Sequence, residues 1–156
     1  MTTASTPLAP ATESAEAGLY RIFVRDLVVP WNIGIYDHEH VGRQRVRFNV
    51  DLLVREAAEF DADKYRQVVC YADIVDKIRH LADDGHVNLV ETLASRVADL
   101  CLADDKVVEA TVRAEKLDAI EGVSSVGIEI TRLKDDAGQD ANRVVRVVGE
   151  TSGPLR

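Results

Sequence analysis

The sequence predicts an α+β fold in which two helices cover one face of a four-stranded antiparallel sheet. Segments in which apolar and polar residues alternate predict strands near both ends of the patterned region. Two amphipathic helical patterns lie between them, so that the predicted order is β-β-α-α-β-β. Hydrophobic residues make up 46% and charged residues 29% of the 156 residues, a composition typical of one globular domain.

The first two strands are predicted at residues 20–29 and 44–54. The first is rich in β-branched and aromatic residues, and we expect it to end at Pro30, which cannot donate to a strand ladder. The second alternates strictly between an apolar set facing a dry core and a polar set facing water: Val46, Phe48, Val50, Leu52 and Val54 against Arg45, Arg47, Asn49 and Asp51. Between the two strands we expect a long polar loop from Trp31 to Arg43.

Two helices are predicted from apolar stripes at helical spacing. The first stripe comprises Ile74, Ile78, Leu81 and Ala82 and ends near the turn signal Asp84-Gly85. The second stripe runs to about Asp104 and comprises Val90, Leu93, Ala94, Val97, Leu100 and Cys101. Asn88 with Glu91 three residues later is typical of a capping box, so we expect the second helix to start there.

Two further alternating segments complete the sheet. Their predicted dry faces are Val108, Ala110, Val112 and Ala114, then Val126, Ile128 and Ile130. The opposite face of the sheet carries Arg45, Arg47, Asn49, Thr111, Arg113, Glu129 and Thr131. Because a four-stranded sheet leaves two open edges, we expect subunits to join edge to edge into a ring with a polar lumen. A monomer with blunted edges is the alternative.

Composition also excludes several classes of protein. The net charge of −8 argues against a nucleic-acid binder, and no apolar run is long enough for a membrane helix. Cys70 and Cys101 form no C-x-x-C pair and fit a reducing cytoplasm. Residues 1–18 are interpreted as a disordered tail, 19–134 as the domain and 135–156 as an extension in which 143–148 could form a short strand.

Four short segments, in this order and spacing, resemble the dihydroneopterin aldolase family of tunnelling-fold (T-fold) pterin enzymes. They are Ile33-Gly34-Ile35-Tyr36-Asp37-His38-Glu39, Cys70-Tyr71-Ala72-Asp73, Asn88-Leu89-Val90-Glu91 and Val112-Arg113-Ala114-Glu115-Lys116. Each motif alone is weak, whereas all four on a matching element order are specific. The resemblance covers roughly Tyr20 to Arg132.

The resemblance implies a reaction in folate biosynthesis. Family members cleave 7,8-dihydroneopterin by a retro-aldol step into 6-hydroxymethyl-7,8-dihydropterin and glycolaldehyde, and many also epimerise the side chain to give dihydromonapterin. The C=N bond of the dihydropterin accepts the electron pair, so the resemblance implies no metal, Schiff base or other cofactor. It also implies a homo-oligomer, a tetrameric ring or an octamer of two rings, with active sites between subunits.

The resemblance implies that Glu91 binds the pterin ring. The 2-amino-4-oxo edge of a pterin presents two parallel N–H donors, and a carboxylate accepts both. Backbone amides near Leu89 and Val90, at a helix N-terminus, are expected to meet the pterin carbonyl oxygen. The alternative from the residues alone is that Glu91 only caps its own helix with Asn88, an interaction of about 0.5–2 kcal/mol.

The resemblance assigns the chemistry to Lys116, Glu39 and Tyr71. Lys116 is expected to act as a base or proton relay, with Glu39 orienting it or the substrate hydroxyl. Tyr71 is expected to protonate or stabilise the enol intermediate through its phenol. Without the resemblance, the three would be interpreted as an edge-strand lysine, a solvated loop charge and a half-buried aromatic.

Three alternatives stay open on the sequence. The motif Lys116-Leu117-Asp118-Ala119 also resembles the sister enzyme dihydroneopterin triphosphate 2′-epimerase, whose triphosphate could be met by Arg43, Arg45 and Arg113. Zinc-binding pterin synthases of the same fold are a weaker match, since His38 and His40 lie in a predicted loop, apart from His80 and His86. The third alternative is a non-catalytic ring protein that binds pterins or purines.

Overall fold

The computed structural model describes residues 18–56 and 68–134, and within these ranges it confirms the predicted α+β fold. The strands are β1 (Leu19–Trp31), β2 (Gln44–Arg55), β3 (Val107–Lys116) and β4 (Val126–Leu133). The helices are α1 (Tyr71–Leu81) and α2 (Val90–Leu102), and a short 3-10 helix, η1 (Asp37–His40), lies between β1 and β2. Residues 1–17 of the predicted tail (1–18) and the extension at 135–156, with its strand at 143–148, lie outside the described residues.

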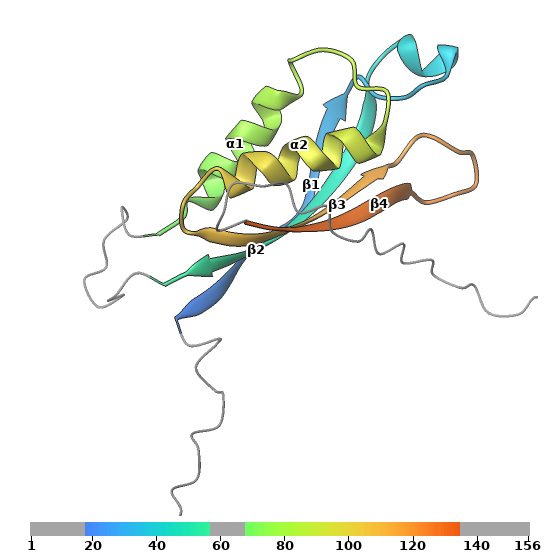
Figure 1. Cartoon of the computed structure of the whole chain (residues 1–156). Helices are drawn as coiled ribbons and strands as arrows, with labels where there is room; N and C mark the ends of the chain where they lie inside the picture. The colour runs from blue at the N-terminus through green and yellow to red at the C-terminus, as the bar shows by residue number, and fades with distance from the viewer. Residues whose placement is uncertain (1–17, 57–67, 135–156) are drawn as a thin grey trace, which may run out of the picture.

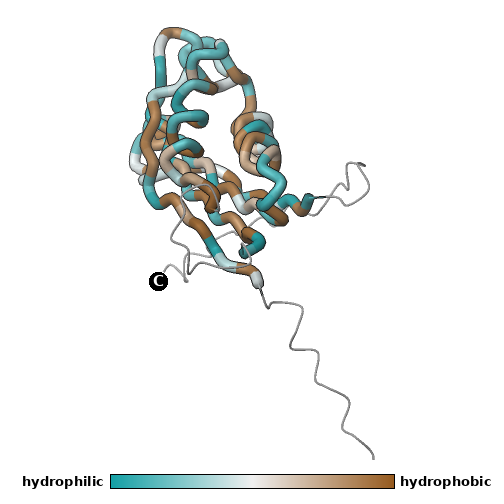
Figure 2. Tube along the Cα trace, turned by 90° about the vertical axis from the view of Figure 1, so that its left-hand side faces the viewer, coloured by the Kyte–Doolittle hydropathy of each residue, from teal (hydrophilic) through white to brown (hydrophobic). Residues whose placement is uncertain are grey.

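The four strands form one antiparallel sheet in the order β1-β2-β3-β4, with both helices on one face (Figure 1). Helix α2 packs on β3 and β4, and α1 packs on β1. The dry face of β2 is buried as predicted: Val46, Phe48, Val50, Leu52 and Val54 are at most 1% exposed. Figure 2 shows the resulting alternation of hydrophobic and hydrophilic residues along the strands.

The prediction that β1 ends at Pro30 is wrong. The strand continues to Trp31, and Pro30 pairs with Arg45 of β2. Proline is tolerated because β1 is an edge strand, where one side of the backbone has no ladder partner. Trp31 is completely buried and lies against Phe48 with ring centroids 5.5 Å apart, so it belongs to the core rather than to a polar loop.

The connection from β1 to β2 is less polar than predicted. Ile33 is completely buried, and Glu39 in η1 is only 5% exposed. Ile33 also forms a parallel bridge with Val87, the residue three positions before α2. This loop is therefore folded against the segment that leads into the second helix.

Two β-bulges shift the strand registers in ways that the alternation did not reveal. The β1–β2 register slips between Val24 and Leu27, where Asp26 adopts a positive φ of 53°. The β2–β3 register slips at Val54, which pairs with Val107. As a result Val107 is buried and Val108 is only half-buried, whereas the simple alternation had placed Val108 on the dry face.

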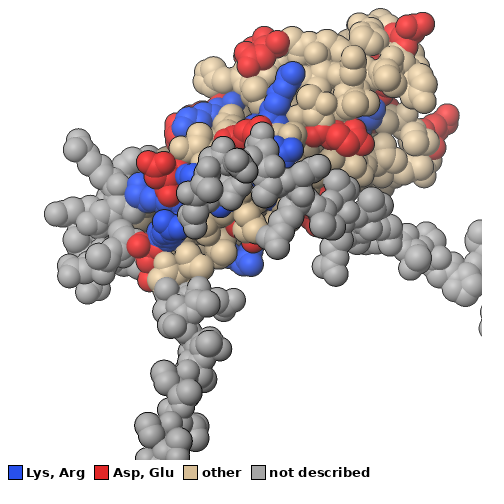
Figure 3. Space-filling model, viewed as in Figure 1, with Lys and Arg blue, Asp and Glu red and all other residues tan. Residues whose placement is uncertain are grey.

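In the described ranges no helix is long and apolar enough to cross a membrane. On the face of the molecule shown in Figure 3, acidic and basic side chains are interspersed rather than gathered into one basic patch.

Candidate active site

A buried ion pair joins the end of β3 to the loop after β1. The Lys116 ammonium donates a hydrogen bond to Glu39 Oε1 at 2.5 Å. The side chains are 17% and 5% exposed, respectively. Water therefore screens this pair far less than a surface pair, and the two groups hold each other in one geometry. Glu39 is not the solvated loop charge that its local sequence suggests.

Two further donors fix the Glu39 carboxylate. Gln44 Nε2 donates to Oε1 at 3.1 Å, and the Tyr36 backbone N–H donates to Oε2 at 3.2 Å. Burial raises the pKa of Glu39, but the hydrogen bonds from Lys116, Gln44 and Tyr36 outweigh burial and bring its pKa down to about 2. Glu39 is therefore an ionised hydrogen-bond acceptor at neutral pH.

Gly34 makes room for this carboxylate. Its φ is +128°, a region that favours glycine, and a Cβ atom there would lie 2.1 Å from Glu39 Cδ. The Gly34 N–H donates to the Val87 carbonyl at 3.0 Å, and His86 Nε2 contacts the Gly34 carbonyl at 2.7 Å. The loop that carries Glu39 is thus held against residues 86 and 87, just before α2.

Replacing Gly34 by alanine is expected to displace Glu39 and to lower catalytic efficiency by about 10²-fold, the cost typical of a misplacement near 1 Å. The strained φ should also lower thermal stability. Steady-state kinetics and thermal unfolding measure the two effects. Gly42→Ala is the matched control, because a Cβ there meets nothing within 4 Å. Equal activity of the two variants would contradict this role of Gly34.

The first turn of α2 carries the predicted binding residues Leu89, Val90 and Glu91. The predicted capping box is wrong: the N-cap is Leu89 rather than Asn88, and it makes no side-chain capping bond. Glu91 is exposed, and its side chain makes no hydrogen bond or ion pair with any residue that the structure describes. Its side chain is therefore open to solvent, and it belongs to the first turn of α2, whose backbone N–H groups have no intrahelical acceptor.

Of the four side chains predicted to bind the ring or to act in the reaction, three lie at one end of the molecule. Lys116 ends β3, Glu39 lies in η1 and Glu91 starts α2, and these segments meet at the same end of the sheet (Figure 1). Tyr71, 68% exposed, begins α1 at the opposite end, where β2 finishes. One chain therefore does not bring Tyr71 to the other three residues.

The three arginines considered for a triphosphate each face a different carboxylate. Arg45 contacts Asp118 through its guanidinium at 2.7 Å and through its backbone N–H at 3.0 Å. Arg43 lies 3.4 Å from Asp83, and Arg113 lies 3.8 Å from the buried Glu115. These cations do not form one cluster at the Glu39–Lys116 pair.

The four histidines do not gather into one cluster, although His40 and His86 meet, contrary to the expectation that they lie apart. His80 contacts the backbone of its own helix, whereas His86 stacks on His40 with ring centroids 3.9 Å apart. His38 stacks on Tyr36. Among residues 18–56 and 68–134, no group of three or more His, Cys, Asp or Glu side chains is arranged to hold a metal ion.

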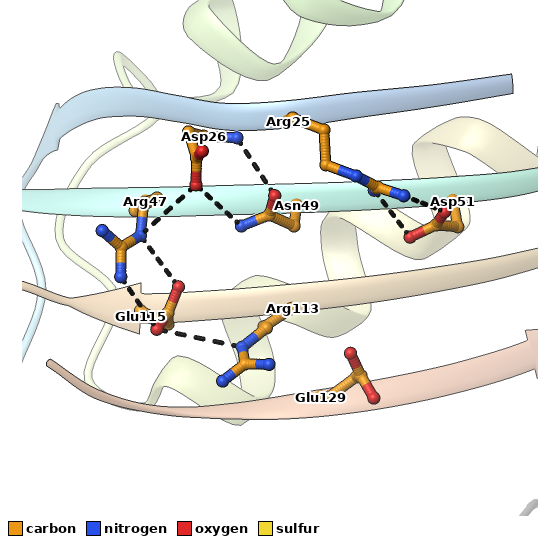
Figure 4. A pocket seen from close by; sticks show the side chains of 8 residues that line it. All are labelled: Arg25, Asp26, Arg47, Asn49, Asp51, Arg113, Glu115 and Glu129. Atoms are coloured by element: carbon orange, nitrogen blue, oxygen red, sulfur yellow. Dashed lines mark hydrogen bonds and ion pairs between the residues drawn. The ribbon is translucent and has the colours of Figure 1, made fainter.

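A hollow of about 380 Å³ lies on the sheet face away from the helices (Figure 4). Arg47 donates to Glu115 at 3.0 and 3.1 Å, and Arg25 donates to Asp51 at 2.8 and 2.9 Å. The full lining is Arg25, Asp26, Arg47, Asn49, Asp51, Arg113, Glu115 and Glu129. None of the predicted catalytic and pterin-binding residues is among them, so this hollow is separate from the Glu39–Lys116 pair.

Gln44 is the site residue that the sequence interpretation missed. A signal was present, because Gln44 has the same parity along β2 as the buried Val46 and Phe48. A polar residue at a dry-face position needs a specific hydrogen-bond partner. Here the partners are Glu39 and the carbonyl of Ile33.

Curated relatives agree with the resemblance. The chain is 27% identical over 111 residues to the dihydroneopterin aldolase of Escherichia coli K12, which covers 71% of this chain and 91% of the relative. It is also 27% identical over 115 residues to the dihydroneopterin triphosphate 2′-epimerase of Pseudomonas aeruginosa, covering 74% and 94% of the two chains.

Solved structures share the fold. The chain is 36% identical to dihydroneopterin aldolase from Burkholderia thailandensis bound to guanine, with a TM-score of 0.66 and coverage of 76% and 94%. Against the E. coli aldolase in complex with neopterin, the identity is 26%, the TM-score 0.64 and the coverage 72% and 98%. The family description "dihydroneopterin aldolase" (FolB) matches residues 22–131, most of the described sheet and both helices. The chain belongs to the dihydroneopterin aldolase family.

Proposed function

We propose that the protein is a dihydroneopterin aldolase of folate biosynthesis, which cleaves 7,8-dihydroneopterin into 6-hydroxymethyl-7,8-dihydropterin and glycolaldehyde. The observation that carries the proposal is the buried Glu39–Lys116 pair, with its 2.5 Å contact, at the end of the sheet where α2 begins. A paired acid and base beside an exposed carboxylate supply what the reaction needs: a proton path and a ring holder.

Glu91 holds the pterin ring in this proposal. Its carboxylate has no competing partner among the described residues, so both oxygens can accept the two N–H donors of the 2-amino-4-oxo edge. The free N–H groups at the start of α2, near Leu89 and Val90, meet the ring carbonyl oxygen. These contacts orient the side chain of the substrate towards Lys116.

Lys116 moves the proton and Glu39 orients it. The side-chain hydroxyl of the substrate gives up its proton as the adjacent carbon–carbon bond breaks and glycolaldehyde leaves. The electron pair passes to the C=N bond of the dihydropterin, and the resulting enamine carbon then takes a proton. Because Glu39 stays ionised, it fixes the position of Lys116 Nζ. In its neutral form the Lys116 amine accepts the hydroxyl proton, and the ammonium so formed donates a proton to the enamine carbon.

Tyr71 completes the site from a neighbouring subunit. Its own chain does not bring it to Lys116, so in this proposal it reaches the Lys116 of a neighbouring subunit when β1 of one subunit joins β4 of the next. We therefore propose a homo-oligomer, a tetrameric ring or an octamer of two rings, that acts in the cytoplasm. The Tyr71 phenol then protonates or stabilises the enol intermediate.

The epimerase is the second candidate, because the Pseudomonas aeruginosa relative carries that name. The aldolase is favoured because Arg43, Arg45 and Arg113 each face a carboxylate and leave no cluster for a triphosphate.

Product analysis separates these functions. The purified protein is incubated with 7,8-dihydroneopterin or its triphosphate, with and without a chelator, and glycolaldehyde and the pterin products are quantified. We expect glycolaldehyde and 6-hydroxymethyl-7,8-dihydropterin in equal amounts, unaffected by chelation. Epimerisation of the triphosphate alone would assign the epimerase, and ligand binding without turnover would assign the non-catalytic ring protein.

A further inference from the structure

The side chain of Gln44, in strand β2, contacts the loop that carries Glu39. It is the first residue of β2, pairs with Trp31 of β1 and is half-buried. Its Nε2 donates to the Ile33 carbonyl at 2.7 Å and to Glu39 Oε1 at 3.1 Å. A primary amide has two N–H bonds, so both donors are used, one on the backbone of the loop and one on its carboxylate.

The orientation of this amide is set by its surroundings. Both partners of Nε2 are acceptors only, so the flipped amide would place its oxygen against two other oxygens. Gln44 Oε1 is buried and has no hydrogen-bond partner among the described residues. A buried acceptor without a partner is unfavourable, which indicates that the two donated bonds decide how the side chain lies.

Glu39 Oε1 is the atom that Gln44 and Lys116 share. It accepts the Lys116 ammonium at 2.5 Å on one side and the Gln44 amide on the other. The Tyr36 backbone N–H donates to the other oxygen, Oε2. Without Gln44, the carboxylate would keep one donor on each oxygen, Lys116 on Oε1 and the Tyr36 N–H on Oε2. It could then rotate about its terminal bond towards Lys116 or towards Tyr36.

We propose that Gln44 is a positioning residue that holds the Glu39 carboxylate, and through it the Lys116 ammonium, in the orientation that the reaction requires. The proposal rests on the function proposed above, but its geometric part can be tested without it. Gln44 acts through Glu39, so its loss should reduce turnover more than ligand binding.

The kinetic test uses Gln44→Met, which keeps the length of the side chain and removes both donors. We expect kcat to fall by about 10- to 100-fold, as for the loss of a hydrogen bond to a charged group, with the Kd for neopterin nearly unchanged. The control is Arg96→Gln, an exposed position in the middle of α2, which should leave kcat and Tm at the wild-type values. A wild-type kcat in Gln44→Met, or a loss that only follows its Tm, would overturn the proposal.

A second variant, Gln44→Glu, gives a signature that a merely structural role would not. Two carboxyl groups about 3 Å apart do not both ionise readily, so at low pH one proton is shared between Glu39 and the new glutamate. The O–H of the protonated group then donates a hydrogen bond to the other carboxylate, in place of the amide donor. When pH rises and this proton is lost, the two carboxylates repel each other. The activity of Gln44→Glu relative to wild type should therefore fall as pH rises, whereas a pH-independent ratio contradicts the proposal.

The other ionisable side chains around this carboxylate are Lys116, which contacts it, His86, which contacts the Gly34 carbonyl, and His40, which stacks on His86. They are present in both proteins, so the ratio of the two pH profiles isolates the change at position 44.

A crystal structure of Gln44→Met without ligand separates this inference from the proposed function. We expect the Glu39 carboxylate to be rotated and its contact with Lys116 lengthened, relative to a wild-type crystal. An unchanged pair would overturn the positioning role. If the wild-type protein releases no glycolaldehyde, the proposed function fails, and this structural readout still decides what Gln44 does.

Discussion

Lys116→Ala is expected to lower kcat by about 10²- to 10⁴-fold, the range typical of losing a general acid–base group, with little change in the Kd for neopterin. The reason is that Lys116 contacts Glu39 rather than the ring-binding end of α2, so it acts on the proton and not on the ring. Rapid-quench measurement of glycolaldehyde release and fluorescence titration with neopterin give the two quantities.

The same substitution leaves a buried carboxylate without its cation, which is destabilising by about 3–5 kcal/mol in comparable pairs. A loss of folding could therefore imitate a loss of catalysis. The double variant Glu39→Gln/Lys116→Met removes both charges and should recover much of the stability in urea unfolding, yet stay inactive. If the double variant also recovers activity, the pair is structural and Lys116 is not the proton relay.

Glu91→Ala is expected to weaken neopterin binding by about 100-fold or more, because two hydrogen bonds to a charged group, each about 1.5–3 kcal/mol, are lost together. Since Glu91 is exposed and has no partner among the described residues, its removal should leave Tm unchanged. Isothermal titration with neopterin measures the Kd. The control is Asp105→Asn, a fully exposed carboxylate beyond the other end of α2.

The two substitutions are expected to separate binding from chemistry. At saturating substrate, Glu91→Ala should retain more of the wild-type kcat than Lys116→Ala does. Equal weakening of neopterin binding in both variants would contradict the division of roles between α2 and the ion pair.

The layers of the fold were predictable because a long, regular pattern determines them. The strict alternation in β2 placed Phe48 and its neighbours in the core, and the stripe of α2 placed Leu93 and Val97 there. Burial of one complete face is a large and repeated free-energy gain, so few local details can override it.

Local exceptions were not predictable from pattern alone. Pro30 stays in a strand because β1 is at the edge, and edge position depends on the strand order rather than on nearby residues. The same holds for the bulge at Asp26 and for the shift of the α2 N-cap from Asn88 to Leu89. Each is a change of one residue, which hydrophobic periodicity does not detect.

The identity of the site residues was predictable, but their burial and their contacts with one another were not. The resemblance selected Glu39 and Lys116, whose separation in the sequence says nothing of a 2.5 Å contact. The burial of Glu39 depends on Gly34 and on the bridge from Ile33 to Val87, which are contacts between distant segments. The role of Gln44 was not predicted, because its hydrogen-bond partners come from the loop and not from its own strand.

A crystal structure of the protein with neopterin tests the central claim most directly. We predict that both Glu91 oxygens accept the N–H groups of the ring edge at about 2.7–2.9 Å, with the hydroxylated side chain directed at Lys116 Nζ. A ring bound elsewhere, for instance in the polar hollow of the opposite sheet face, with Glu91 left in solvent, would contradict the account.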